Sequence, residues 1–262
     1  MLGTCRLCQQ LNCDLQMSHL LPAAGYERLR KSGDPRRHPV VINAEVTYEA
    51  SWQAQDYLLC RKCEQLGNSK GEDWILRNCW MKVDEFPLHA NLVAAAPVTT
   101  TPDVKTFHAG ALSEINVDRI VYFAASVFWR ASAHAWPIGR NTTQDAGILG
   151  PYEERFRKYL LAEKGFPENC ALWVMVAENN TPAVFSMLAP YRGPIRSWHT
   201  YKFVFLGIGF ELFVGRAIPQ DYREMCFVRG AGNPIYMSDR FSDRIVGEMW
   251  MSIQRTRNLI KK

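Results

Sequence analysis

The sequence lacks a long hydrophobic run, an internal repeat and a low-complexity tract. Its most apolar stretch, residues 203–214 (FVFLGIGFELFV), is interrupted by Glu211 and falls short of the roughly 20 residues that a membrane-spanning helix needs. The first ten residues, MLGTCRLCQQ, have no apolar segment behind a basic cap, so no signal peptide is expected. We therefore expect a soluble, cytoplasmic protein that does not bind a membrane.

Neither basic nor acidic residues are in large excess, because the 31 Lys and Arg residues are nearly balanced by 26 Asp and Glu residues, which leaves a formal net charge of +5. A bias this mild permits contact with nucleic acid but does not require it. Hydrophobic residues make up 47% of the 262 residues and charged residues 22%, which is a globular composition and excludes bulk disorder. The length is enough for one large domain or two ordinary ones.

Half of the cysteine residues fall in two C-x-x-C pairs. Four of the eight cysteines form these pairs, Cys5 with Cys8 and Cys60 with Cys63. Thiols stay reduced in the cytosol, so the pattern favours metal binding over disulfides. Four thiolates suit a structural Zn²⁺ ion, which they hold at about 2.3 Å with no open position for chemistry. The competing interpretation is two unrelated pairs of free thiols, with Cys13 as a nearby spare thiol.

Composition divides the chain into three regions. Residues 1–90 hold both cysteine pairs and are expected to form a small zinc-binding domain. Residues 91–110 (NLVAAAPVTTTPDVKTFHAG) are small, β-branched and interrupted by proline, which is typical of a linker or an extended edge segment. Residues 111–262 are expected to form a second domain, of the α+β class.

Two helices are well signalled in this last region. The segment 116–136 begins at Asn116, the expected N-cap residue, and is apolar nearly all round, so we expect it to be buried. The segment 150–165 has proline and acidic residues at its start and glycine at its end. Strand-like runs then predict a mainly antiparallel sheet, and an amphipathic helix with a basic end closes the chain. The runs are 171–178, 183–190, 201–215 and 224–230, and the closing helix is 242–262.

Polar residues lie between and after the cysteine pairs. The segment 18–22 reads SHLLP, and Glu64 and Glu72 follow the second pair on a predicted helix. Eight residues are close to two helical turns, so both carboxylates can point the same way if the helix runs unbroken through Gly67 and Gly71. A basic stretch could contact phosphates or be only a solvated loop. It comprises Arg28, Arg30, Lys31, Arg36, Arg37 and His38.

The order of these motifs resembles that of treble-clef zinc fingers, and in particular of the HNH nuclease superfamily. The chain is similar to a set of bacterial HNH-like proteins that share C-x-x-C, S-H-[IL]-[IL]-P and L-L-C-x-x-C-E-Q segments. In this sequence they read CRLC (5–8), SHLLP (18–22) and LLCRKCEQ (58–65). Two later segments, FAASVFWRASAHAW (123–136) and LGPYEERFRKYL (149–160), are also similar to that set.

The resemblance implies a treble-clef fold and a nuclease site. By position, His19 matches the general base that deprotonates water, and Glu64 matches the helix ligand for a divalent ion, with Glu72 as a further candidate. The ion, Mg²⁺ or Mn²⁺, would stabilise charge on the leaving oxygen of the scissile phosphate. The implied activity is a metal-dependent endonuclease, acting on DNA more than RNA, in defence against foreign DNA.

Two departures from the HNH pattern keep an alternative function open. Ser18 stands where active members have Asp or His, and Gln53, Gln55 and Asp56 provide no counterpart of their middle Asn. The alternative is a non-catalytic zinc module that binds nucleic acid or a protein partner. Chemistry in residues 111–262 is a third possibility, but no nucleophile or phosphate-loop signature supports it.

Each candidate catalytic residue also has a structural interpretation. His19 could brace a hairpin through a backbone carbonyl. Glu64 could stabilise a helix N-terminus, where a carboxylate interacts with the helix dipole. Glu72 could be a solvated helix residue.

Arg130 lies in the apolar helical segment, and a buried guanidinium needs an acidic partner. We expect this partner to be Glu153 or Glu154 on the following helix. His134, four residues later, would extend the same polar cluster.

Overall fold

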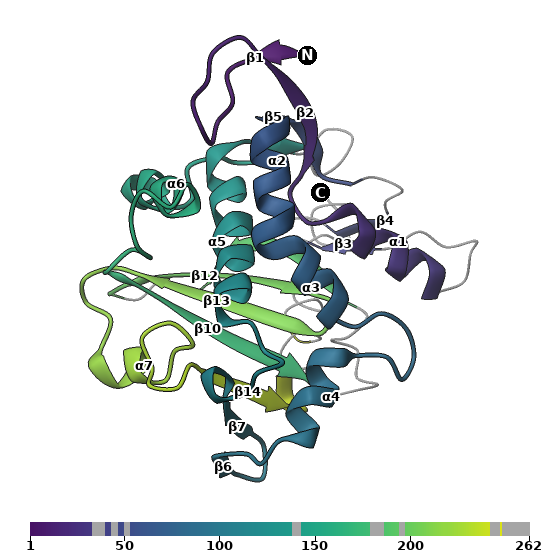
Figure 1. The fold of residues 1–262 in the computed structure, drawn as a ribbon, viewed down its shortest axis with the longest axis vertical. Helices are drawn as coiled ribbons and strands as arrows, with labels where there is room; N and C mark the ends of the chain where they lie inside the picture. Colours follow the sequence, from purple (N-terminus) through teal and green to yellow (C-terminus); the bar gives the residue numbers. More distant parts are fainter. Residues whose placement is uncertain are drawn as a thin grey trace, which may run out of the picture.

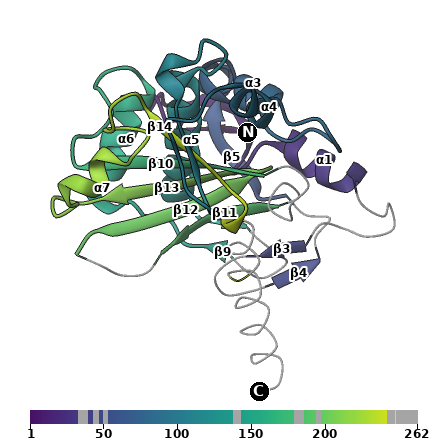
Figure 2. The ribbon, with the colours of Figure 1, turned by 90° about the horizontal axis from the view of Figure 1, so that it is seen from below.

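The computed structural model describes residues 1–32, 40–42, 47–49, 53–137, 143–178, 186–193, 197–241 and 247. The fold is α+β, as predicted, and its main sheet is antiparallel except for one parallel pair. Helices α5 and α6 lie on one side of that sheet (Figure 2). A smaller sheet carries the N-terminal cysteine pair (Figure 1).

The N-terminal part is built on a three-stranded antiparallel sheet in the order β1-β2-β5. Its strands are β1 (Leu2–Gly3), β2 (Cys13–His19) and β5 (Gln55–Cys60). Helix α1 (Ala23–Ser32) follows β2, and the chain then forms a short hairpin before it returns in β5. The hairpin strands are β3 (Val40–Ile42) and β4 (Thr47–Glu49).

The chain then forms one helical rod from residue 61 to residue 78. It consists of α2 (Arg61–Gly67), a π-helical turn (Asn68–Glu72) and α3 (Asp73–Asn78), and the backbone stays helical at both junctions. The helix therefore runs unbroken through Gly67 and Gly71, although a π-turn has a wider winding than an α-helix. Helix α4 (Pro87–Ala94) follows with proline in its first turn.

The main sheet has seven strands in the order β11-β12-β13-β10-β14-β7-β6. Strand β14 pairs in parallel with β10 and antiparallel with β7. The bounds are β6 (Thr99–Thr100), β7 (Lys105–His108), β10 (Cys170–Ala177), β11 (Met187–Arg192), β12 (His199–Phe205), β13 (Ile208–Val214) and β14 (Pro234–Ser238).

Helix α5 (Val117–Ala133) lies between this sheet and the 61–78 rod (Figure 1). Its N-cap Asn116 accepts a hydrogen bond from the backbone N–H of Arg119 at 3.0 Å, as the sequence predicts. Nearly every residue of α5 is buried, and Phe123 packs against Phe205 and other sheet aromatics. One hydrophobic cluster thus joins the cysteine region to the main sheet.

Shorter elements connect α5 to the sheet. Strands β8 (Trp136–Pro137) and β9 (Thr143–Gln144) form a small hairpin, and α6 (Glu153–Leu160) begins after a 3-10 turn at Gly150–Tyr152. A second 3-10 turn covers Ala109–Ala111, and α7 (Gln220–Glu224) precedes β14.

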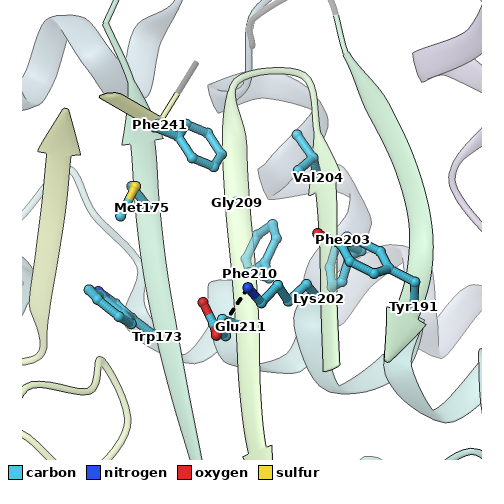
Figure 3. A pocket seen from close by; sticks show the side chains of 10 residues that line it. All are labelled: Trp173, Met175, Tyr191, Lys202, Phe203, Val204, Gly209, Phe210, Glu211 and Phe241. Atoms are coloured by element: carbon cyan, nitrogen blue, oxygen red, sulfur yellow. Dashed lines mark ion pairs between the residues drawn. The ribbon is translucent and has the colours of Figure 1, made fainter. Parts of the chain in front are cut away.

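The other side of the main sheet, away from α5 and α6, carries a small hollow of about 30 Å³ (Figure 3). Lys202 of β12 and Glu211 of β13 point toward each other there and form an ion pair at 3.5 Å. Phe241 lies over Gly209, where an added Cβ would come within 2.4 Å of the ring. Trp173 of β10 lines another side of the hollow.

Several element predictions need correction. The run 201–215 is not one strand but the hairpin β12–β13, because Leu206 and Gly207 both have positive φ (46° and 85°) and make its tight turn. The run 224–230 is not a strand; it forms only one isolated bridge, between Val228 and Leu172. The closing helix predicted at 242–262 lies outside the described residues except for Gly247.

Residues 91–110 hold the end of α4 and the strands β6 and β7, which pair at one edge of the seven-stranded sheet. They therefore contribute structure to the fold, and the division of the chain into two domains stays a prediction. Within the described ranges, no helix is both long enough and apolar enough to span a bilayer.

The contact between the rod and α5 gives a first test. In Gly71→Ala, the new methyl would lie 2.8 Å from the backbone N of Phe123 and 2.9 Å from its Cα. Backbone cannot yield as a flexible side chain can, so we expect a loss of about 1–3 kcal/mol in unfolding free energy, measured by urea denaturation. Gly165→Ala meets no atom within 4 Å and is the matched control. Equal effects of the two changes would contradict the packing described.

Candidate metal centre and the adjoining carboxylates

The two cysteine pairs, far apart in the sequence, meet in space. Their Sγ atoms all lie within 4.8 Å of one another, and Cys8 Sγ is 3.8 Å from Cys60 Sγ. A tetrahedral site with metal–sulfur bonds of about 2.3 Å has sulfur–sulfur edges of about 3.8 Å. The four thiols, those of Cys5, Cys8, Cys60 and Cys63, could therefore hold a metal ion such as zinc.

Local backbone structure places each sulfur. Cys5 and Cys8 lie in the tight turn after β1, where the N–H of Gln9 donates to the carbonyl of Cys5 at 2.9 Å. Cys60 ends β5, and Cys63 lies in the first turn of α2. A knuckle, a strand pair and a helix start thus converge on one point, which is the arrangement of a treble clef.

The other nearby thiol stays out of this set. Cys13 Sγ donates to the carbonyls of Gly3 and Gln10, at 3.5 and 3.4 Å. The interpretation of Cys13 as a spare thiol agrees with this geometry.

Crowding of the thiols perturbs their acidity. A hydrogen bond from the Cys63 thiol lowers the pKa of Cys5 to about 4, and the same hydrogen bond raises the pKa of Cys63. Four thiolates with a divalent ion would carry two excess negative charges. Three exposed cations, Arg6, Arg61 and Lys62, lie between the cysteines of the two pairs, where they can offset that charge.

The candidate carboxylates Glu64 and Glu72 converge on one guanidinium. Arg130 of α5 is 3% exposed; its Nη1 is 2.6 Å from Oε1 of Glu72, and its Nη2 is 3.9 Å from Oε2 of Glu64. Burial alone would lower the pKa of Arg130, but the charges of Glu72 and Glu64 outweigh burial and raise it. Arg130 therefore stays charged and bound to both acids.

The π-turn explains why these two carboxylates share a face. Eight residues of regular α-helix turn through about 800°, which leaves the second side chain roughly 80° past two full turns. The wider winding at Asn68–Glu72 turns less per residue and removes much of this excess. The predicted convergence is present, but the wide turn produces it.

The predicted partners of Arg130 were wrong. Glu153 accepts a hydrogen bond from Ser132 Oγ at 2.6 Å, and Glu154 pairs with Arg157 at 2.6 Å. Ser132 lies two residues after Arg130, about 200° round the helix, so the side of α5 that faces α6 is not the side that carries the guanidinium.

Ser18, where the sequence departs from the HNH pattern, contacts Glu64. It is buried; its hydroxyl donates to Oε1 of Glu64 and accepts from the N–H of Leu59 at 3.3 Å. Both oxygens of Glu64 thus face a protein partner, Ser18 on one side and Arg130 on the other. Glu64 lies in the first turn of α2, where the helix dipole stabilises a carboxylate, so its structural interpretation agrees with this position.

His19 lies beside this cluster. Burial lowers the pKa of His19, although the charge of Glu64 and a hydrogen bond with Gln55 oppose the shift. The imidazole is therefore neutral at neutral pH, as a general base must be. Its backbone carbonyl accepts a hydrogen bond from Arg130 Nη1 at 3.2 Å.

The catalytic role of His19, Glu64 and Glu72 stays a prediction. Among the residues that the structure describes, the four cysteines are the group of metal-ligating side chains close enough to share an ion. The guanidinium of Arg130 is the positive charge that the two carboxylates contact.

The predicted basic loop divides into different environments. Arg28, Arg30 and Lys31 belong to α1 rather than to a loop. Arg28 points inward and donates to the carbonyl of Leu76 at 2.6 Å and to Cys79 Sγ at 3.0 Å. Arg30 and Lys31 are exposed at the end of the helix. Arg36, Arg37 and His38 lie outside the described residues.

Sequence reasoning missed the pair His134 and Asp56. Nε2 of His134 is 2.8 Å from Oδ2 of Asp56, across 78 residues of sequence. His134 does not extend the Arg130 cluster as predicted, because it is the C-cap of α5 and its extended backbone takes it off the helical face. No local pattern links residues so far apart.

The buried ion pair generates a second test. Arg130→Met leaves Glu72 buried without its counter-charge, so we expect a loss of about 3–5 kcal/mol in unfolding free energy. Arg130→Met combined with Glu72→Gln should recover part of that loss, because the stranded charge is removed. Lys158→Met breaks an exposed pair with Glu154 and should cost less than about 1 kcal/mol. An Arg130 variant as mild as that control would show the pair to be energetically unimportant.

Comparisons of the chain with protein-family profiles, with curated proteins and with solved structures find no match. The resemblance to the HNH superfamily therefore depends on the motifs themselves. The four-thiol centre and the Arg130 cluster stand on the geometry alone.

Proposed function

We propose that the four cysteines bind one structural Zn²⁺ ion. A set of four thiolates is the donor set that Zn²⁺ accepts in closed structural sites, and such sites contribute directly to folding. Bound there, the ion supplies no open position for substrate. Cys5 and Cys8 belong to the knuckle after β1, Cys60 ends β5 and Cys63 lies in the first turn of α2, so the site would link the two edge strands of the N-terminal sheet.

We further propose that the protein is an HNH-like module that binds nucleic acid without hydrolysing it. The observation that carries this proposal is the position of the Arg130 guanidinium against Glu72 and Glu64. A divalent ion at these carboxylates would have to displace a buried cation that is already paired. Ser18, which hydrogen-bonds Glu64, replaces a ligand by a hydroxyl donor.

Exposed cations around the cysteines support the nucleic-acid part. Arg6 lies within the first pair, Arg61 and Lys62 lie within the second, and all three are exposed. Elsewhere, Arg30 in the last turn of α1 is exposed as well. Lysine and arginine side chains of this kind contact phosphates and release counterions, which makes binding dependent on salt. The net charge of +5 permits the same partner.

One observation favours a metal-dependent endonuclease as the second candidate. His19 keeps the position of the general base, is neutral, and is close enough to feel the charge of Glu64. Glu64 is 3.9 Å from Arg130, whereas Glu72 is 2.6 Å away, so the Glu64 carboxylate is held less tightly. A Mg²⁺ or Mn²⁺ ion recruited by Glu64 and His19 could then act on DNA, and a role in defence against foreign DNA would follow.

Metal content tests the zinc proposal. Purified protein should contain one zinc per chain by plasma mass spectrometry, and Cys60→Ser should lose it and unfold at lower temperature. Cys13→Ser is the matched control, since its thiol bonds only backbone carbonyls, and it should retain the metal. Zinc retained in Cys60→Ser, or lost equally in Cys13→Ser, would refute the assignment.

A binding and cleavage assay distinguishes the two functions. We expect duplex DNA to bind with an affinity that falls as salt rises, and to stay intact with Mg²⁺ or Mn²⁺. Reversing Arg61 and Lys62 to glutamate should weaken binding about tenfold or more while zinc content is unchanged, because two phosphate contacts become repulsive.

Reversal of Lys158 on α6 and Lys164 after it, which do not lie between the cysteines of either pair, changes net charge equally and is the control. His19→Ala should leave binding unchanged. Metal-dependent cleavage that disappears in His19→Ala would establish the endonuclease instead.

A further inference from the structure

The N-terminal sheet carries an exposed aromatic residue beside the cysteine centre. Tyr57 of β5 is paired with Met17 of β2, and the two residues are 39% and 43% exposed. Residues two apart on a strand share a face of the sheet, so Met17 lies on the same face as Leu15, which pairs with Cys60. Tyr57 and Met17 therefore form an open platform, the Tyr57–Met17 platform, on the face of the sheet that also carries the thiol of Cys60.

The ring of Tyr57 is not committed to the fold. Tyr122, Tyr201 and Tyr236 each donate their hydroxyl to a backbone carbonyl, and each lies near another ring. In the part of the chain that the structure describes, Tyr57 has neither a hydroxyl hydrogen bond nor a ring partner. Part of its aromatic face is thus open to a ligand.

Cations flank the platform. The backbone N–H of Arg6 donates to the carbonyl of Leu58 at 3.1 Å, which places this part of the knuckle against β5 next to Tyr57. Arg61 and Lys62 begin α2 directly after the last residue of β5, which is about 10 Å along the strand from Tyr57. Figure 1 shows the start of α2 beside β5 at the end of the molecule that carries the knuckle. All three cations are exposed.

These cations lack acidic partners, whereas the acids around them are paired. Among the residues that the structure describes, no carboxylate forms an ion pair with Arg6, Arg61 or Lys62. The carboxylates of β2, β5 and the first turn of α2 each have a partner: the N-terminal amine for Asp14, the ring of His134 for Asp56, and the hydroxyl of Ser18 for Glu64. The uncompensated charge at this end of the sheet is therefore positive, and it favours an anionic ligand.

A strand with unpaired bases fits this combination of ring and cations. In a duplex the base faces are stacked inside, whereas a single strand exposes them to aromatic side chains. Stacking of a base on a protein ring depends little on sequence, because every base has a π-face. A duplex would use the cations alone and leave the ring of Tyr57 without a role. An acidic polypeptide would also meet the cations but carries no flat ring between its charges.

We propose that the Tyr57–Met17 platform binds single-stranded DNA. One base stacks on the ring of Tyr57 and contacts Met17, and the phosphates on either side of it pair with Arg6 and with Arg61 and Lys62. This inference rests on the proposed nucleic-acid binding and deepens it, because it names the strand with unpaired bases as the preferred form. Duplex DNA binds the same cations more weakly.

An oligonucleotide that lacks bases tests the stacking step. The intact chain is titrated, by fluorescence anisotropy, into a single strand of twelve nucleotides, into its duplex and into an abasic strand of equal length. We expect the wild type to prefer the base-bearing strand to the abasic strand by about five- to a hundredfold. Tyr57→Ala should remove this preference and leave both the affinity for the abasic strand and the zinc content unchanged. Tyr57→Phe keeps the ring and should retain the preference.

Two methionines of equal exposure provide the matched control. Met17 and Met225 are both 43% exposed, but Met225 is the C-cap of α7, which lies away from the knuckle (Figure 1). Met17→Ala should weaken binding of the base-bearing strand about two- to fivefold, because the base loses part of its apolar contact. Met225→Ala should leave the affinity unchanged.

The outcomes separate this inference from the proposed function. Equal affinity of the wild type for base-bearing and abasic strands would overturn the platform, and salt-dependent duplex binding that Tyr57→Ala leaves intact would let nucleic-acid binding stand. Absence of binding to all three probes would remove both. Displacement of the strand by polyglutamate of equal charge, as effectively as by DNA, would assign the surface to an acidic polypeptide instead. Tighter binding of RNA of the same sequence, by about tenfold or more, would overturn the choice of DNA.

Discussion

Burial of one guanidinium constrains much of this structure. Arg130 is buried in the last turn of an apolar helix, and a charge in that position is tolerated only where opposite charges meet it. Both acids come from the 61–78 rod, and a further acceptor is the backbone of His19. Strand, rod and α5 are therefore fixed relative to one another by a single side chain.

The same rod connects this cluster to the thiol centre. Cys60 and Cys63 lie at its N-terminal end, and Glu72 in its middle pairs with Arg130 of α5. Glu64 lies between the two and is held by Ser18 as well. Glu64, which resembles a metal ligand by sequence, thus contacts protein groups of the fold. These contacts are the physical reason for proposing nucleic-acid binding rather than hydrolysis.

Short-range patterns were a good guide to some of these features. The spacing of the cysteines was enough to predict their meeting, and Asn116 marked the start of α5 because capping is a local interaction. Partners distant in sequence were not predictable in the same way. Glu72 is 58 residues from Arg130, whereas Glu153 and Glu154 were nearer and were wrongly preferred. The β12–β13 hairpin was missed because its turn begins at Leu206, a residue that rarely adopts positive φ.

The π-turn has a consequence for how such sites are recognised. In a plain α-helix, two carboxylates seven positions apart are separated by about 700°, only about 20° short of two full turns. The wide turn at Asn68–Glu72 is thus equivalent to a single inserted residue that leaves the acids in alignment. A search pattern with a fixed interval of eight would pass over a chain that places the same two acids seven apart. Two such chains are equivalent when the two acids are separated by the same angle around the helix axis, even if the interval between them in the sequence differs.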